Sequence, residues 1–244
     1  MPNQSQFDPN ATAAVLAAAA TGDVETIAKL VGQADLTATD SGSFGFHKKT
    51  ALMIAASGGH AECVRLLLPG SDQLANNGMG NALIYAIRGR KEECANLLLS
   101  AQDGAEAAKA SDSTGQTTVM LAALSHSKML IERLLPLVDA NARDDYGRNA
   151  FGNAILCNLF DAARMLAPVS DFAAKDKAGR SFMDDASEEQ ASAARAIMDE
   201  ELARRESVEL AAALPKQLAP KKAMKANAEA TSKVGEPAHP SRRI

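Results

Sequence analysis

The residues of this chain whose types could carry out covalent or metal chemistry are few and widely spaced. The three cysteines are Cys63, Cys94 and Cys157, and the four histidines include His60 and His126. None of them belongs to a CxxC or HExxH pattern, so the sequence predicts no metal site. A nucleophile also needs a base or a positive environment, and the spacing shows no acid–His–nucleophile arrangement. We therefore predict no catalytic residue, no metal and no cofactor.

The cysteines are better interpreted as packing residues. Cys63 and Cys94 occupy the same slot of two related segments, and each is followed by a small apolar residue. We expect both thiols to be buried, and a redox or metal pair is the alternative. Cys157 lies near a break between predicted helices, where we expect more exposure. Three scattered cysteines indicate a reducing compartment and no disulfide framework.

Histidine and acidic residues likewise favour structural roles. His60 follows a glycine pair between two predicted helices, and we expect it to pack in that loop. The acidic pairs Asp144–Asp145 and Asp184–Asp185 lie in a turn and near a helix start. We expect them to be solvated or to cap helices, with an acid/base pair as the alternative.

The elements that must position these residues repeat along the chain. Weaker copies begin near Ala13 and at Ser181. Apolar residues recur at i, i+3 and i+4 twice in each clear copy, with a break between, which predicts two helices per unit. A proline closes three of the copies and marks the end of the second helix. The clear copies are Thr50–Pro69, Asn81–Ser100, Thr117–Pro136 and Asn149–Pro168.

The linkers between copies share a pattern of their own. Asp112, Asp144 and Asp176 each begin a D-x-x-G-x-T/N/S segment. Asp and Gly in this arrangement are typical of a tight turn in which Gly adopts a left-handed conformation. The Thr, Asn or Ser that follows is placed to cap the next helix.

This set of slots resembles the ankyrin-repeat family, whose unit of about 33 residues is a β-turn followed by two antiparallel helices and a loop. Among the matching residues are Ala55-Ala56, Gly59-His60 and Leu67-Leu68. The resemblance covers roughly residues 11–205, about six units, of which the first and last act as caps. It implies an all-α helix-turn-helix solenoid with hairpin-like loops. The family's T-P-L-H motif has lost its His in every copy, which predicts less firmly held helix starts.

Composition agrees with a solenoid of closely packed helices. The chain of 244 residues has no Trp, two Tyr and seven Phe, and it is rich in alanine. Small side chains let stacked helices approach, whereas a β-sandwich or barrel would use larger ones. No apolar run is long enough for a membrane span, and the N-terminus lacks a signal-peptide pattern. We expect a flexible N-terminus at 1–10, an ankyrin-repeat domain at 11–210 and a disordered tail at 211–244.

Charge separates the tail from the body. Residues 211–244 hold seven Lys/Arg and two Glu, which leaves a net charge of −9 on residues 1–210 because the whole chain carries −4. An acidic body disfavours nucleic acid, so we expect none as a partner. The basic tail is interpreted as a solvated end, and an acidic partner, an anionic surface or an export signal are the alternatives. Before it, Ser187 and Gln190 form a capping box for a helix that should run to about Leu210.

The resemblance implies a non-enzymatic protein-protein interaction module, such as an adaptor, scaffold or inhibitor. In that family the partner lies on the concave face of turn tips and first helices. Tyr146 is our first candidate, because Tyr is enriched at binding hot spots. The alternative for Tyr146 is that its ring packs on the next turn. The alternative for Leu124 and Leu156 is that their side chains rotate inward, away from a partner. The face carried over slot by slot comprises Lys48, Lys49, Ser57, Met79, Arg88, Gln116, Leu124, Asp145, Tyr146, Arg148 and Leu156.

Two further expectations concern the long segment Thr39–Thr50 before the second unit and the cellular location of the protein. Phe44 and Phe46 form an apolar finger for a partner or fold back over the first unit. We expect a cytoplasmic monomer that binds a protein partner and has no membrane span. The alternative function is a secreted effector or regulatory protein, delivered to another cell, with the tail as its targeting signal.

Overall fold

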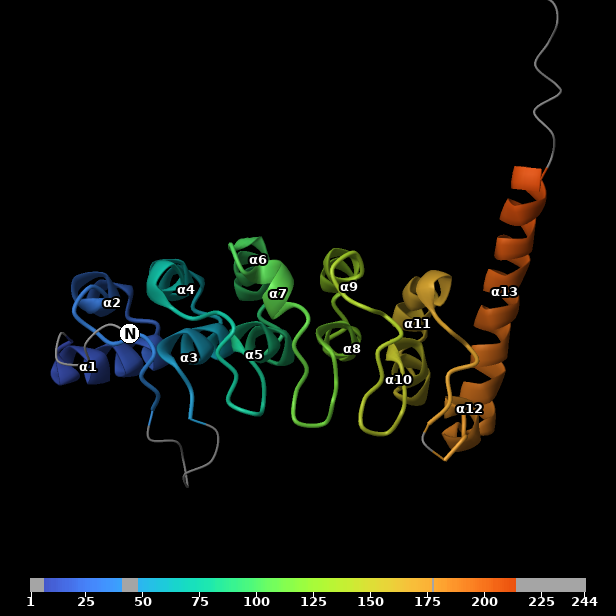
Figure 1. Cartoon of the computed structure of the whole chain (residues 1–244), viewed down its shortest axis with the longest axis horizontal. Coiled ribbons are helices and arrows are strands. Elements are labelled where there is room, and N and C mark those ends of the chain that lie inside the picture. Colours follow the sequence, from blue (N-terminus) through green and yellow to red (C-terminus); the bar gives the residue numbers. More distant parts are fainter. Residues whose placement is uncertain (1–6, 41–47, 177, 214–244) are drawn as a thin grey trace, which may run out of the picture. The chain divides into compact units, whose positions relative to one another are not determined.

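Helix pairs form where the sequence repeats predict them (Figure 1). The structure is a computed structural model that describes residues 7–40, 48–176 and 178–213. Phe44, Phe46 and the tail from residue 214 lie outside the described residues, as do residues 1–6. The predicted boundaries of the flexible N-terminus, the repeat domain and the tail therefore stay predictions.

Each unit consists of a first and a second helix. A short helix, α7 (Gly104–Ala107), lies between the third and fourth units. The last pair is α12 (Phe182–Asp185) and α13 (Glu188–Ala213). The other first helices are α1 (Pro9–Thr21), α3 (Ala51–Gly58), α5 (Ala82–Arg88), α8 (Thr118–Leu124) and α10 (Ala150–Leu156). The other second helices are α2 (Val24–Leu30), α4 (Ala61–Leu67), α6 (Glu92–Ser100), α9 (Lys128–Leu134) and α11 (Phe160–Leu166).

The predicted caps begin the first helices. The Thr50 hydroxyl accepts a hydrogen bond from the N–H of Met53 at 3.3 Å, and the Asn149 side chain accepts one from Gly152 at 2.9 Å. These bonds satisfy N–H groups that the first turn of a helix leaves without a partner. The second helices α4, α9 and α11 end two residues before Pro69, Pro136 and Pro168, as the sequence predicts.

Two rows of helices make up the unit of the fold that extends to Glu201 (Figure 1). The first helices pack on one another in sequence order, and so do the second helices from α2 to α11. Alanines occupy the contact between first helices: Ala55, Ala86, Ala122 and Ala154 are all buried. Because alanine is small, the backbones can approach closely, while leucines of the second helices fill the space behind. The chain from Leu202 on is a separate unit, of which the end of α13 is described.

The connecting turns extend beyond the row of first helices, on the side away from the second helices (Figure 1). Within the described residues these turns contain isolated antiparallel bridges and no strand, for example between Ser111 and Thr117. Gly115, Gly147 and Gly179 have φ values of 73°, 81° and 79°. The D-x-x-G pattern thus produces the left-handed glycine turn that it predicts.

The helix starts are held by side chains that replace the missing His of the family motif. The Asn81 amide donates to the carbonyl of Ala107 at 2.9 Å, and the Asn149 amide donates to that of Asp171 at 2.9 Å. In the fourth unit the Thr118 hydroxyl donates to the carbonyl of Ala108 at 2.5 Å. The expectation of loosely held starts is therefore wrong for these units, because each start is bonded to a distant loop.

The sixth unit closes the row with an aromatic cluster. Phe151 of α10 lies 4.9 Å from Phe172 and 5.5 Å from Phe182, measured between ring centroids. A Cβ on Gly152 would come within 2.9 Å of the Cβ of Phe182, so glycine allows this contact. The capping box of Ser187 and Gln190 is present, and it starts α13 as predicted.

Candidate interaction surface

An aspartate organises each of the last three turns. Asp112, Asp144 and Asp176 each accept hydrogen bonds from backbone N–H groups two and four residues later, at 2.8 to 3.0 Å. The side chains of Asp112 and Asp144 are fully buried, and that of Asp176 is 13% exposed. We call these three residues the turn anchors, because the backbone of each turn is folded around a carboxylate.

The anchors also hold side chains that face the turns. Asp112 receives Arg88 of the preceding unit, whose guanidinium nitrogen lies 2.8 Å from a carboxylate oxygen. Asp144 receives the Asn153 amide at 2.9 Å, and the Nε of Arg148 lies 3.4 Å from the same carboxylate. A buried carboxylate needs such partners, since leaving it alone would be costly. The anchors therefore fix the directions of side chains on this face.

Tyr146 is the most prominent side chain of this face. It is 63% exposed, and the guanidinium carbon of Arg148 lies 4.5 Å from its ring centroid. Arg148 also forms an ion pair with Asp144 at 3.4 Å, so the ring lies beside a cation whose charge is compensated within the turn. The structure therefore favours an exposed aromatic group over a tyrosine packed into the next turn.

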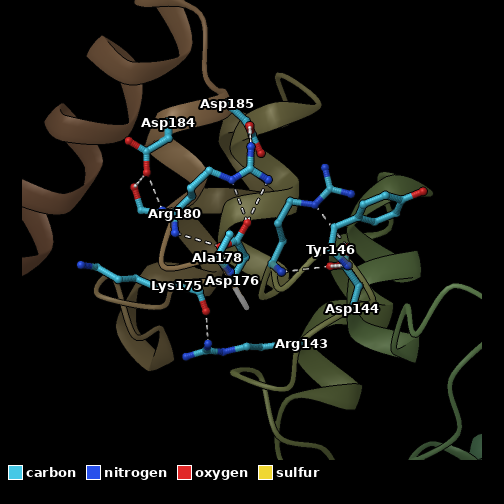
Figure 2. A network of polar contacts seen from close by, with 11 residues as sticks. Arg143, Asp144, Tyr146, Lys175, Asp176, Ala178, Arg180, Asp184 and Asp185 are labelled. Atoms are coloured by element: carbon cyan, nitrogen blue, oxygen red, sulfur yellow. Dashed lines mark hydrogen bonds and ion pairs between the residues drawn. The ribbon is translucent and has the colours of Figure 1, made fainter.

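The sixth turn has a more exposed network (Figure 2). Arg180 lies 2.9 Å from Asp176 and 3.5 Å from Asp185 in two ion pairs. The pKa of Asp176 is lowered by the backbone hydrogen bond from Arg180 and by that residue's side chain and charge, and the pKa of Arg180 is raised in turn. Arg143 of the fifth turn donates to the carbonyl of Lys175, which links the two turns.

A tyrosine and an asparagine of the third unit connect it to the turn of the second unit. The Asn77 amide donates to the carbonyl of Lys48 at 3.0 Å and lies 3.0 Å from the Tyr85 hydroxyl. The Asn77 carbonyl accepts from the N–H of Met79 at 3.1 Å. The ammonium of Lys49 lies over the Tyr85 ring, 4.6 Å from its centroid. The side chains of Asn77, Tyr85 and Lys49 thus connect two units without a carboxylate.

We call the turns and the adjoining first helices the turn face, and all the predicted binding residues lie on it. None is fully buried. Leu124 and Leu156 pack against the core, which favours their inward rotation, and Leu156 accepts a hydrogen bond from Gln190 at 2.9 Å through its carbonyl. The exposed members are Lys48, Arg88, Asp145 and Tyr146. The half-buried members are Lys49, Ser57, Met79, Gln116, Leu124, Arg148 and Leu156.

The residues that connect this surface were missed as site residues. Asn77 joins Lys48 to Met79, and Asp112 joins Arg88 to the N–H of Gln116. A signal for Asp112 was present, because it recurs in phase with the other anchors. Asn77 had no such signal, since it does not recur in the other turns and its bond to the carbonyl of Lys48 crosses to a neighbouring unit.

The cysteines and His60 are not among the predicted binding residues of the turn face. Cys63 and Cys94 are buried as predicted, and Cys157 is exposed. Burial raises the pKa of the Cys63 thiol and raises that of Cys94 to about 11, so both thiols stay protonated near neutral pH. His60 lies with its Nε2 3.3 Å from the carbonyl of Ala20, in the loop as expected.

A pocket of about 490 Å³ lies between the second helices α9 and α11. Ile131, Phe160 and Arg164 contribute to its lining, and none of the predicted binding residues does. Arg164 is paired with Glu200 at 2.7 Å. No group of three metal-ligating side chains was found within the described ranges, and no helix in them is long and apolar enough to cross a membrane.

The comparison with known families agrees with the repeat architecture. The family model for ankyrin repeats, described as three copies, matches residues 14–111. The search of curated proteins gave no match. Beyond residue 111, the helix pairs α8/α9 and α10/α11 continue the unit that the first three pairs establish. Residues 14–111 are therefore similar to ankyrin repeats, which are general protein-protein interaction modules.

Proposed function

We propose that the chain is a non-enzymatic binding protein, an adaptor, scaffold or inhibitor, that holds its partner on the turn face. The observation that carries this proposal is the exposed Tyr146 ring beside Arg148, which forms an ion pair with the buried Asp144. Aromatic and arginine side chains supply much of the energy at protein interfaces. Side chains that are already fixed lose less entropy on binding.

The row of turns supports the same proposal over a longer surface. The N–H of Asp145 donates to the carbonyl of Thr114 at 3.0 Å, so the fourth and fifth turns are bonded to each other. Arg143 and the carbonyl of Lys175 connect the fifth and sixth turns in the same way. A partner would therefore meet several turns as one preorganised surface.

The proposal is tested with the full chain and a partner purified from the native cell. The double variant Tyr146→Ala/Arg148→Ala should lose most of that partner in affinity capture. The matched control is Val24→Ala/Lys29→Ala on α2, where Val24 is 40% exposed and Lys29 is an exposed cation. Circular dichroism checks that both variants fold. Equal recovery by the two variants would contradict the assignment of the turn face.

The proposal includes a cytoplasmic monomer that binds no nucleic acid. Buried thiols at Cys63 and Cys94 and the acidic charge of residues 1–210 support it. Light scattering of the purified chain should give the monomer mass. A stable dimer, or tight binding to a random oligonucleotide at physiological salt, would contradict these parts of the proposal.

A further inference from the structure

One cation of the turn face differs from its counterparts in the later units. Lys49, Arg148 and Arg180 each directly precede the N-cap residue of a first helix. Arg148 and Arg180 return to the aspartate of their own turn, at 3.4 Å and 2.9 Å. Their charge is therefore compensated within the turn.

The Lys49 ammonium group does not pair with the aspartate of its own turn. Asp40, the aspartate of its turn, accepts a hydrogen bond from the backbone N–H of Lys49 at 2.8 Å. The ammonium group turns instead to the next unit and lies over the ring of Tyr85, 4.6 Å from the centroid. Within the described ranges neither Lys48 nor Lys49 has a carboxylate within ion-pair distance.

The acidic group bonded to Lys49 is Asp40, and its carboxylate accepts the backbone N–H rather than the ammonium group. Asn76 stands where the later turns have their aspartate, and its side chain accepts from the N–H of Gly78 at 2.8 Å. The carboxylate of Asp112 is already engaged by Arg88. The segment that leads into Lys48, residues 41–47, contains no Asp or Glu in its sequence. The positive charge of this pair is therefore available to a ligand.

The pair is also held in place. The Asn77 amide bonds the carbonyl of Lys48, and Asn77 also bonds the hydroxyl of the half-buried Tyr85. An aromatic ring attracts an ammonium group but accepts few of its N–H bonds, so donors of Lys49 remain for a ligand. A carboxylate is the acceptor that would satisfy them best.

We propose that Lys48 and Lys49, with Tyr85 as a platform, receive a short acidic segment of the partner protein. The inference rests on the proposed function, because it assigns partner chemistry to the turn face. One or two carboxylates need only this pair of lysines. A long polyanion such as nucleic acid would also meet the charge of −9 on residues 1–210, which opposes it.

The test uses a fluorescein-labelled peptide of four glutamates flanked by glycine and serine, and the full chain, in fluorescence anisotropy. We expect binding that weakens with added salt and that the glutamine version of the peptide lacks. The variant Lys48→Ala/Lys49→Ala should bind about tenfold more weakly. The control Lys29→Ala/Lys128→Ala removes two exposed lysines of the second helices and should bind as the wild type does.

The platform has its own readout. Tyr85→Phe keeps the ring and should retain affinity within about twofold, whereas Tyr85→Leu should lose about threefold. Equal loss in both variants would contradict a role for the ring. A thermal melt shows whether either variant is unfolded, and Lys48→Ala/Lys49→Ala tests the site independently because neither side chain is fully buried.

The remaining outcomes separate this inference from the proposed function. Absence of binding to the glutamate peptide, or equal weakening by the control variant, overturns the acidic-segment site. A single-stranded oligonucleotide that binds more tightly than the peptide and depends on the same lysines also overturns it. If the native partner is lost with Tyr146→Ala/Arg148→Ala but retained by Lys48→Ala/Lys49→Ala, the function stands and this inference fails.

Discussion

The two tyrosines of the chain each lie beside a cation, yet the two pairs are built in opposite ways. In the third unit Tyr85 is half-buried and bonded to Asn77, and it holds Lys49. In the fifth unit Arg148 is held by Asp144, and Tyr146 extends into solvent beside it. The fixed partner is the aromatic ring in the first pair and the cation in the second.

The Lys49–Tyr85 and Arg148–Tyr146 pairs therefore differ in the group that they offer on the turn face. At Lys49 the ring beneath the ammonium group brings no opposite charge, which supports the proposed binding of an acidic segment there. At Tyr146 the charge is already compensated by the buried Asp144, and the exposed group is the apolar ring. The row of turns thus carries a cation over a half-buried ring at Lys49 and an exposed ring beside a paired cation at Tyr146.

Removal of the fifth-unit anchor should have the largest effect. Asp144→Ala would leave the N–H groups of Tyr146 and Arg148, the Asn153 amide and the Arg148 charge without their acceptor. We expect a loss of about 3 to 5 kcal/mol in urea unfolding.

The matched change in the third unit is Asn76→Ala. Asn76 is exposed and accepts one backbone hydrogen bond, so about 1 kcal/mol should be lost. Equal losses in the two variants would break the distinction between an anchored and an unanchored turn.

The close approach of the fifth and sixth turns gives the next largest effect. A Cβ on Gly147 would lie 2.4 Å from the Cα of Asp176, whereas one on Gly179 would meet nothing within 4 Å. Both glycines have positive φ, so Gly179→Ala should cost about 1 kcal/mol and Gly147→Ala about 3 kcal/mol. Urea unfolding measures both, and similar values would show that the turns do not pack as described.

The tyrosines should differ in stability as well as in binding. Tyr85→Ala removes a half-buried ring and its bonds to Asn77 and should cost about 2 kcal/mol. Tyr146→Ala should change the free energy of unfolding by less than about 0.5 kcal/mol. Thermal melts of both variants check this, and a larger loss for Tyr146→Ala would mean that its ring is a packing residue.

The smallest effect concerns acid. The pKa of Asp176 is lowered, so the stabilisation by its ionised form is present above the unfolded pKa of about 3.8 and is lost as pH falls through the lower folded value. Asp176→Asn should therefore lower the free energy of unfolding near neutral pH, flatten the acid limb of the stability curve, and meet the wild-type curve at low pH. Stability of wild type and variant is compared between about pH 2 and pH 6, and an unchanged acid limb would remove this role.

Sequence patterns predicted the elements of the fold because their causes are local. A cap such as Thr50, a glycine such as Gly147 and a stop such as Pro69 act within a few residues of their own position. The alanine slots were predictable for a related reason, since a repeat stacks on a copy of itself.

The connections within the candidate surface could not be predicted in the same way. Lys49 and Arg148 occupy the same slot, but one reaches the next unit and the other its own turn. The contact that each cation makes depends on whether Tyr85 or a buried aspartate lies near it in the folded chain. The sequence of one unit alone does not show this. The missing family His misled the prediction for the same reason, because Asn81 and Asn149 bond loops more than twenty residues away.

Hydrogen exchange of the full chain with and without its purified partner tests the central claim most directly. We expect the partner to slow backbone amide exchange in the turns and first helices around Lys49, Tyr85 and Tyr146. Exchange in the second helices α4, α9 and α11 should not change. Protection confined to those second helices, with none in the turns, would contradict the turn face as the site of binding.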